Sequence, residues 1–338
     1  MLRLAREGVA HLANKKPTTL ELAAQASAVQ QARSNTPRKP VIGLALGSGS
    51  ARGWAHIGVI QALEKAGIHA DVVCGTSIGG LVGAAYAAGE LTRFEKWVTG
   101  LGFRDVVSFM DLGLNGGMLK GEKVMEFFRK NFVDRPIEEL NLPFGVVATA
   151  LHSGAEIWLR TGSTVDAVRA SLGMPGLFTP VRHGGKVLVD GGLVNPVPVS
   201  LARAMGAEIV IAVDLSSDLL GHRHMHPEVV TSEAPPSLVS EWMRKLQETF
   251  GRASSDEAGE APVLLPSMLS TVAQSLNIMQ VRITRSRMAG EPPELIIAPR
   301  LAHLGLLEFH RAGEAIEEGR RAVEVGLHNL EALGLQAP

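Results

Sequence analysis

The sequence predicts an α/β protein with a mainly parallel central sheet. Short apolar runs typical of buried strands alternate with helical segments, as in VIGLALG at 41–47 and VVCGT at 72–76, each followed by a helix. At 338 residues, with 46% hydrophobic and 20% charged residues, the chain is long and apolar enough to bury a substantial core. Glycine-rich turns lead from both runs into the following helices, and such turns share one edge of a parallel sheet.

Composition and charge exclude several classes of protein. The net charge of −1 and the sequence pI of about 6.8 lack the excess of basic residues that is typical of nucleic-acid-binding proteins. A single cysteine, Cys74, allows no intramolecular disulfide and is expected to pack as a small hydrophobic residue. The first 16 residues lack the continuous apolar core of a secretory signal, and the charge-free stretch Val72–Gly89 is interpreted as a buried strand and helix. We therefore expect a cytoplasmic protein, with peripheral contact to membranes left open.

The sequence suggests three regions. Residues 1–40 form a basic N-terminal extension, in which Thr18 or Thr19 is a candidate N-cap for a weak helix. This extension is either a basic arm that contacts anionic lipid or a solvated segment without such a role. Residues 41–215 are expected to form the catalytic core, and residues 216–338 a loop and helical region packed on it.

The first strand leads into a glycine-rich loop, Gly47–Gly53, and then a helix at 54–67. Amides of such a loop bind phosphate or an oxyanion. A nucleotide site is disfavoured because the loop lacks Gly-Lys-Ser/Thr and fits GxGxxG only with serines in two glycine positions. His56 is expected to be a packed, hydrogen-bonded residue and not a catalytic base. Arg52 either positions a phosphate-bearing substrate or bonds neighbouring carbonyl groups.

Ser77 lies at the next turn from strand to helix, in the GxSxG pattern GTSIG at 75–79. A serine on such a sharp corner needs residues without side chains two before and two after it. It would then project at a helix N-terminus, where amides stabilise an oxyanion. The alternative is a glycine-rich packing turn. The preceding loop favours catalysis, because consecutive turns of a parallel sheet place an amide cradle beside this serine.

The middle of the chain continues the alternation of helices and strands. Residues 91–142 are expected to be helices and loops, in which 100–128, with its apolar residues at 103–114 amid glycines, form either a mobile cap over an apolar pocket or ordinary core helices. The other predicted elements are a hairpin of 144–151 and 156–161, a helix at 164–172, an irregular segment at 174–181 and strands flanking Gly184-Gly185.

Asp190 ends the predicted strand KVLVD and is followed by Gly191-Gly192. A carboxylate at a strand end before two glycines is well placed to face a neighbouring loop at close range. The alternative interpretation is an Asx-type turn, in which the side chain bonds only its own backbone.

The C-terminal third contains fewer regular signals. His222, His224 and His226 suggest a metal site by their alternate spacing, but no cysteine or placed carboxylate accompanies them and we expect no metal. The predicted elements are a helix at 198–207, a strand at 208–215, helices at 237–250 and 269–288, a strand at 294–301 and an amphipathic helix at 307–333.

Taken together, SGSARG at 48–53 followed by HIGV, GTSIG at 75–79 and DGG at 190–192 before NPVP resemble the patatin-like phospholipase family. The resemblance is strongest to its compact bacterial members related to neuropathy target esterase. Softer similarities, including SLGMPGLFTPV at 171–181, extend it over roughly residues 40–335. It implies a three-layer α/β/α patatin-like fold.

The resemblance also implies a serine hydrolase with a Ser/Asp dyad and without a catalytic histidine, metal or cofactor. Ser77 would be the nucleophile and Asp190 the base. The oxyanion donors would be the amides of Gly49, Ser50 and Ala51, to which the geometry of the turn adds Ile78. The supporting motif residues are Gly47, Arg52, Gly53, Gly75, Gly79, Gly191 and Gly192. Ser48 and Ser50 depart from the family's usual glycines, which affects the loop's conformation more than its chemistry.

The expected function is therefore hydrolysis of acyl esters in lysophospholipid, phospholipid or another lipid. Acyl transfer through the same acyl-enzyme is a variant of this function. The alternative is a regulatory or adaptor protein that retains the fold and binds a protein partner. The presence of Ser77, Asp190 and the amide loop favours the enzyme, because a binding module has no need of all three.

Overall fold

The structure is a computed structural model that describes residues 39–109, 121–175, 177–219 and 268–332. The chain divides into two units, Met1–Pro40 and Val41–Pro338, and the description below concerns the second. The expected N-terminal helix, the helix at 237–250 and the three histidines at 222, 224 and 226 lie outside the described residues.

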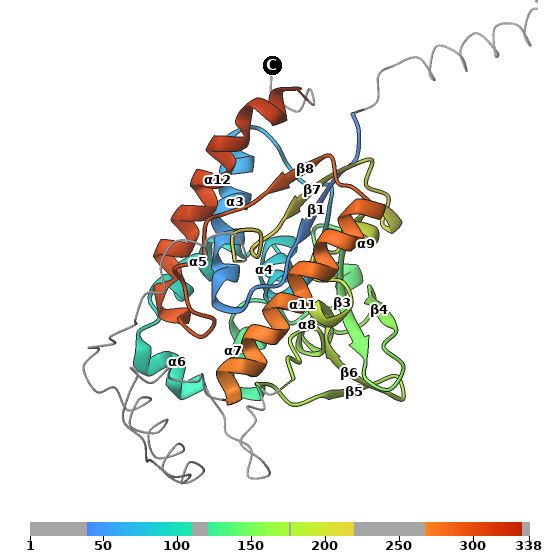
Figure 1. Ribbon diagram of the computed structural model, residues 1–338, viewed down its shortest axis with the longest axis vertical. Coiled ribbons are helices and arrows are strands. Elements are labelled where there is room, and N and C mark those ends of the chain that lie inside the picture. Colours follow the sequence, from blue (N-terminus) through green and yellow to red (C-terminus); the bar gives the residue numbers. More distant parts are fainter. Residues whose placement is uncertain (1–38, 110–120, 176, 220–267, 333–338) are drawn as a thin grey trace, which may run out of the picture. The chain divides into compact units, whose positions relative to one another are not determined.

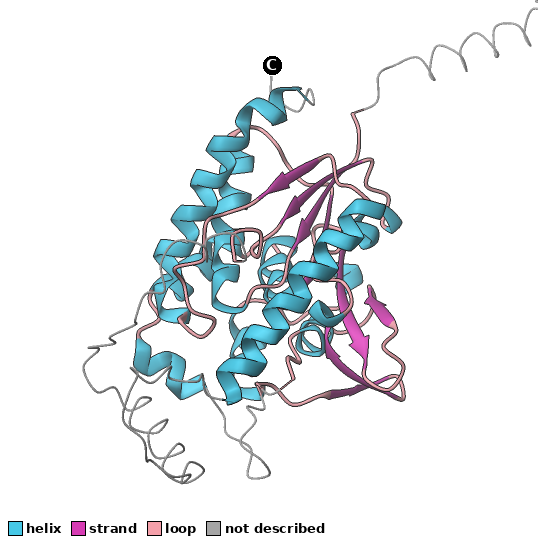
Figure 2. Ribbon diagram, in the orientation of Figure 1, coloured by secondary structure: helices cyan, strands magenta, loops and turns pink. Residues whose placement is uncertain are grey.

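Within the described residues, eight strands form one sheet (Figures 1 and 2). Its order is β5-β6-β3-β2-β1-β7-β8, with β4 also paired to β3. β3, β2, β1, β7 and β8 run parallel, whereas β4, β5 and β6 join by antiparallel pairing. The strands are β1 (Ile42–Leu46), β2 (Val72–Thr76), β3 (Phe144–Ala150), β4 (Glu156–Leu159), β5 (Val181–His183), β6 (Lys186–Asp190), β7 (Ile209–Val213) and β8 (Leu295–Ile297). The predicted α/β class with a mainly parallel sheet is confirmed.

Helices cover both faces of this sheet. The helices are α3 (Ala55–Lys65), α4 (Ile78–Ala87), α5 (Leu91–Thr99), α6 (Phe103–Phe109), α7 (Glu122–Asn131), α8 (Thr164–Ser171), α9 (Val199–Ala204), α11 (Met268–Gly290) and α12 (Ala312–Ala332). Because strand side chains alternate, Leu44 and Val73 pack with α3, α4 and α12, whereas Ala45 and Cys74 pack with α9. The result is the expected three-layer α/β/α arrangement, and Cys74 packs as a small hydrophobic residue.

Short 3₁₀ turns modify two of the predicted helices. The turn Ser50–Trp54 precedes α3, and Phe309–Arg311 precedes α12, which begins later than the predicted Leu307. The other two turns are Ile137–Glu139 and Gly191–Leu193. The stretch Val72–Gly89 is the predicted strand and buried helix, and no helix of the described residues is long and apolar enough to cross a membrane.

β2 and β6 meet end to end along one edge of β3. β3 pairs with β2 through Phe144–Val147 and with β6 through Ala148–Ala150. β4 pairs with Val146–Thr149, which overlaps both stretches, so β2 and β6 must share the opposite edge. β2 runs parallel to β3 and β6 antiparallel. Their carboxyl ends therefore face each other, which brings Ser77, directly after β2, to Asp190 at the end of β6.

Candidate active site

Ser77 occupies a strained turn between β2 and α4. Its φ of 56° and ψ of −124° lie outside the regions that non-glycine residues favour. A Cβ on Gly75 would lie 2.4 Å from the backbone of Gly79, and a Cβ on Gly79 would lie 2.3 Å from the carbonyl oxygen of Leu46. The two glycines of GxSxG are therefore required by close backbone packing, as the motif predicts.

The side chains of Ser77 and Asp190 are brought together. The Ser77 hydroxyl donates to Asp190 Oδ2 at 2.5 Å, and both residues are almost fully buried. The other carboxylate oxygen, Oδ1, accepts from the Gly192 amide at 2.7 Å. The two interpretations of Asp190 are thus both realised, because one oxygen forms the Asx-type turn and the other meets the neighbouring loop.

Burial changes the ionisation of Asp190. Desolvation raises the pKa of its carboxyl group to about 6, while the hydrogen bonds from Ser77 and Gly192 oppose this rise by stabilising the charged form. The carboxylate is therefore the predominant form near neutral pH, ready to accept a proton.

Ser171 is a site residue that the sequence reasoning missed. The Ser77 amide donates to Ser171 Oγ at 2.8 Å, and the Ser171 hydroxyl donates to the Val147 carbonyl at 2.6 Å. Ser171 is fully buried at the end of α8. The pattern at 164–172 predicted the helix correctly, but a serine at a helix end gives no sign of which backbone group it will bond.

The glycine-rich loop contributes fewer unengaged amides than expected. The Ala51 amide donates to the Leu306 carbonyl at 3.1 Å, so it is already engaged. In the part of the chain that the structure describes, no hydrogen bond takes the amides of Gly49, Ser50 or Ile78. Ser50 has a φ of 53°, which resembles the backbone strain at Ser77.

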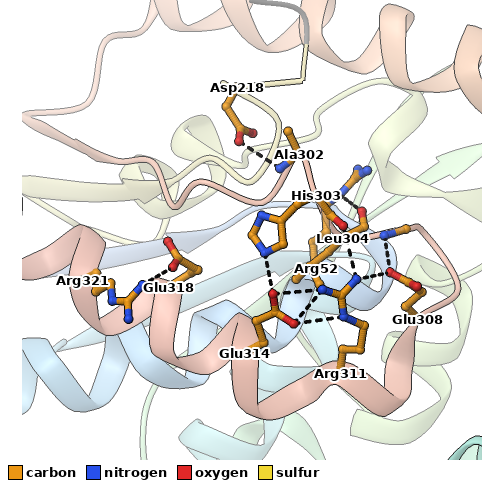
Figure 3. A network of polar contacts seen from close by, with 11 residues as sticks. Arg52, Asp218, Ala302, His303, Leu304, Glu308, Arg311, Glu314, Glu318 and Arg321 are labelled. Carbon is orange, nitrogen blue, oxygen red and sulfur yellow. Dashed lines mark hydrogen bonds and ion pairs between the residues drawn. The ribbon is translucent and has the colours of Figure 1, made fainter. Parts of the chain in front are cut away.

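The C-terminal segment between β8 and α12 holds this loop in place. Ser50 Oγ donates to the Leu306 carbonyl at 2.6 Å, and the indole of Trp54 donates to the Phe309 carbonyl at 3.1 Å. Buried Arg52 donates through Nε to the Leu304 carbonyl at 2.9 Å, within the polar network drawn in Figure 3. Of the two interpretations of Arg52, bonding to carbonyl groups is the one observed. No local sequence pattern indicates this contact, because the partners lie about 250 positions apart.

His56 also supports the loop and does not reach the Ser77–Asp190 pair. Its Nε2 donates to the Gly47 carbonyl at 2.7 Å, and its side chain is fully buried. Burial lowers its pKa to about 4 despite this hydrogen bond, so the ring is neutral at physiological pH. The expectation of a packed, hydrogen-bonded histidine is confirmed.

An apolar pocket opens at Ser77 and Ser50. Its walls include Trp54, Leu81, Trp97, Phe109, Phe178 and Phe309. Val106, Phe109 and Val124 line the pocket, and Val106 also lies in the buried core against which Phe109 and Val124 pack, so each interpretation of this segment is met in part; residues 110–120 lie outside the described residues. The pocket combines side chains of residues 50–178 with Leu307 and Phe309 around the buried Ser77.

Comparison with known proteins identifies relatives. The patatin-like phospholipase family pattern matches residues 44–203. An uncharacterized NTE family protein of Mycobacterium bovis is 30% identical over 347 aligned positions, which cover 88% of this chain and 93% of that protein. Mouse patatin-like phospholipase domain-containing protein 6 is 37% identical over 183 positions, covering 52% of this chain and 14% of that protein.

A solved structure shares the fold. The crystal structure of VipD from Legionella pneumophila aligns with a TM-score of 0.50 and 14% sequence identity, covering 88% of this chain and 67% of that chain. At this identity the likeness shows the fold, and the mycobacterial relative, aligned over most of both chains, shows the family. The chain therefore belongs to the patatin-like phospholipase family, among its NTE family members, a family of lipid hydrolases.

Proposed function

We propose that this protein is a serine hydrolase of lipid acyl esters, with Ser77 as nucleophile and Asp190 as its base. The observation that carries the proposal is the 2.5 Å hydrogen bond from the Ser77 hydroxyl to Asp190 Oδ2 at an apolar pocket. A nucleophile in contact with a base is the arrangement that covalent catalysis requires. Family membership supports the lipid ester as the substrate class.

Acylation begins when Ser77 Oγ attacks the ester carbonyl carbon and its proton passes to Asp190. The tetrahedral oxyanion is stabilised by the amides of Gly49, Ser50 and Ile78, which carry no other hydrogen bond among the described residues. Collapse of this intermediate breaks the bond to the leaving alcohol, which takes the proton from Asp190. The acyl group remains on Ser77.

Deacylation repeats these steps with water as the nucleophile. Asp190 accepts a proton from water as the water oxygen attacks the acyl carbon. Collapse breaks the bond from that carbon to Ser77 Oγ, which recovers the proton, and a free acid leaves. The raised pKa of Asp190, about 6, suits a group that must both accept and return a proton near neutral pH.

The pocket supports an aliphatic acyl chain as the group that binds beside Ser77. Its lining is predominantly aromatic and aliphatic, and Leu81, Trp97 and Phe309 are among the side chains in reach of a bound chain. Burying methylene groups there gains about 0.8 kcal/mol for each. We therefore expect longer acyl chains to bind better than acetate, up to the length that the pocket accepts.

The test uses a fluorophosphonate probe and a series of p-nitrophenyl esters of increasing acyl length. Wild type is expected to be labelled and to hydrolyse the esters, whereas Ser77→Ala is expected not to be labelled. Hydrolysis by Ser77→Ala and Asp190→Asn should fall about 10⁴-fold.

The matched control is Ser163→Ala. Ser163 is the half-buried N-cap of α8 and its hydroxyl accepts from the Asp166 amide. This variant should be labelled like wild type. Folding of all variants is checked by circular dichroism, and a folded wild type that neither reacts with the probe nor cleaves any ester contradicts the proposal.

A further inference from the structure

Helix α11 packs one side on the molecule and leaves the other side in solvent. The packed side includes Gln280 and Thr284, which are buried, and a Cβ built on Gly192 would lie 2.5 Å from Gln280 Nε2. Near its C-terminal end, Met288 packs against the apolar cluster that α9 forms with β1 and β2. α11 therefore lies on the α9 face of the sheet, whereas α3 and α12 cover the other face (Figure 1).

The solvent side of α11 carries apolar side chains beside arginines. Residues three, four, seven and ten or eleven positions apart share one side of a helix. The exposed residues that follow this spacing, which we call the α11 outer face, are Ser275, Ile278, Met279, Arg282 and Arg285. Ile278 is 43% and Met279 is 48% exposed. Adjacent apolar side chains of this size in solvent indicate an interaction surface.

The arginines of the α11 outer face have no negative charge beside them on the helix. α11 contains no Asp or Glu. In the part of the chain that the structure describes, Arg282 and Arg285 form no hydrogen bond or ion pair through their side chains, whereas Arg287 pairs with Glu156 at 2.6 Å. The first acidic residue after the helix is Glu291. The face therefore presents two cations to an outside partner.

Strand β4 adds an aromatic ring and another cation on the same side of the sheet. Glu156 accepts hydrogen bonds from Trp158 Nε1 and from Arg287 of α11, both at 2.6 Å. Because side chains alternate along a strand, Trp158 and Arg160 share the side of Glu156, on which α11 packs. Trp158 is 40% exposed, and Arg160 is exposed without an ion pair among the described residues. Tryptophan is enriched where membranes meet water.

An anionic lipid surface fits this combination of side chains. Apolar side chains enter the boundary between headgroups and acyl chains, while arginines are attracted to negative headgroups. The long arginine side chain allows the guanidinium group to stay at headgroup level beside an inserted neighbour. A second copy of the chain fits less well, because a twofold contact across this face would bring the arginines of both copies toward one another. Membership in a family of lipid hydrolases agrees with a lipid partner.

We propose that the α11 outer face docks the protein on a membrane surface that contains anionic lipid. Ile278 and Met279 enter the boundary below the headgroups, and Arg282 and Arg285 bind the negative headgroups. This inference goes beyond the proposed function and does not depend on it, because it concerns binding alone and uses no residue of the catalytic pair.

The test measures co-sedimentation of the full chain with vesicles of diether phosphatidylcholine, with and without diether phosphatidylserine. Ether lipids contain no acyl ester, so the protein cannot hydrolyse them during the measurement. Wild type is expected to bind the mixed vesicles at least about tenfold more tightly, because each arginine near an anionic surface gains about fivefold in binding. Raising the salt from about 0.1 M to about 1 M should weaken this binding, because the Debye length falls from about 10 Å to about 3 Å.

Two double variants test the two parts of the face. Arg282→Gln/Arg285→Gln should bind the mixed vesicles about 25-fold more weakly than wild type, as expected for the loss of two such cations. Ile278→Ser/Met279→Ser should bind them at least about tenfold more weakly, because its side chains no longer gain from leaving water. Circular dichroism checks that each variant is folded, and either pair carries the test if the other does not fold.

The matched controls lie on the helices that cover the other face of the sheet. Lys65→Gln/Arg321→Gln removes two exposed cations from α3 and α12. Val325→Ser removes an apolar side chain of α12 that is 86% exposed. Both controls should bind the mixed vesicles like wild type.

The inference is overturned if wild type does not distinguish the mixed vesicles from phosphatidylcholine, or if both double variants bind like wild type. A dimer in size-exclusion chromatography that the variants lose, without vesicle binding, would also overturn it, because the face would then join two copies. Wild type that hydrolyses no ester would instead contradict the proposed function and leave the vesicle result unaffected.

Discussion

The turn Gly75–Gly79, which we call the elbow, and the glycine-rich loop Gly47–Gly53 both lead from a parallel strand into a helix. Different contacts hold the two turns in place. Each contains a non-glycine residue with positive φ, Ser77 at 56° and Ser50 at 53°. The elbow is fixed by elements that surround β3, through Asp190 and Ser171. The loop is fixed by the segment before α12, which lies 256 positions after Ser50 at its shared carbonyl.

This difference indicates which parts of the site can vary independently. The elbow's partners are Asp190 at the end of β6 and Ser171 at the end of α8, and a shift of β6 against β2 would move Ser77 and Asp190 relative to each other. The segment that holds the loop also supplies Leu307 and Phe309 to the pocket wall. Changes in that segment therefore adjust the amide loop and the pocket together, while the hydrogen bonds that join the elbow to Asp190 and Ser171 lie elsewhere. The two turns still touch, since a Cβ on Gly79 would lie 2.3 Å from the Leu46 carbonyl oxygen.

The largest effect is expected from Gly75→Ala, which breaks the elbow. The added Cβ would lie 2.4 Å from backbone atoms of Gly79 and Gly80, which cannot move as a side chain can. We expect a loss of about 3 kcal/mol in the free energy of unfolding and at least about a 100-fold loss of kcat/KM, from chemical denaturation and ester hydrolysis. The control is Gly100→Ala, whose Cβ would be 3.4 Å from its nearest neighbour. Wild-type activity in Gly75→Ala would show that the elbow tolerates displacement.

The pH dependence of activity tests which region contains the titrating group. Because burial raises the pKa of Asp190 to about 6, kcat/KM should rise with pH through about 6 and fall about tenfold per unit below it. The loop-side His56, whose pKa burial lowers to about 4, would give its inflection nearer that value. A pH profile of ester hydrolysis with an inflection only near 4 would assign the titration to the loop and contradict the proposed base.

The same ionisation affects stability in the opposite sense to activity. The folded-state pKa of Asp190 lies above the usual value of 3.8, so its contribution to stability is fully present below about 4 and is lost as pH rises to about 6. Asp190→Asn should therefore raise the free energy of unfolding at pH 7 by about 1–3 kcal/mol, with little difference from wild type at pH 4. Urea denaturation at the two pH values measures this, and equal differences at both would exclude the linkage.

Ser171→Ala tests whether the elbow depends on its buried serine. The change removes the hydrogen bonds that join Ser171 Oγ to the Ser77 amide and to the Val147 carbonyl, at a cost of about 1–3 kcal/mol. We expect kcat to fall about tenfold with KM little changed, because the turn that holds the nucleophile relaxes. Ser163→Ala on the same helix removes an N-cap, costs about 1 kcal/mol and should leave kcat unchanged. Equal kcat values in the two variants would show that the hydrogen bond from the Ser77 amide to Ser171 is not needed to hold the elbow in its active conformation.

The smallest effects are expected at Ser50, where two substitutions distinguish the effect of the positive φ from that of the hydrogen bond to the Leu306 carbonyl. Ser50→Ala loses the hydrogen bond to Leu306 but keeps the positive φ, so it should destabilise the protein by about 1 kcal/mol. Ser50→Gly loses the same bond but relieves the strain, so its thermal stability should stay close to wild type. Comparable melting temperatures for both variants would show that φ at this position carries little strain.

Much of the fold and of the site could be predicted from the sequence because the signals are local. The elbow is specified by GTSIG, since the glycines are needed within two residues of Ser77, and the strand and helix around it follow from hydrophobic periodicity. The position of Asp190 at a strand end before two glycines allowed either a contact with a neighbouring loop or an Asx-type turn, and its role as the base came from the resemblance to the family. Its two alternative interpretations could not be separated, because each describes one oxygen of the same carboxylate.

What the sequence by itself determined is the order of elements, the strained serine and the glycine-rich loop before it, because each depends on residues a few positions apart. The tertiary structure alone decided that Ala51 donates to Leu306, that Arg52 bonds Leu304 and that the Trp54 indole bonds Phe309. These contacts join residues far apart in the chain. Their formation depends on how helices pack against the sheet, and the local pattern around either partner carries no record of that packing.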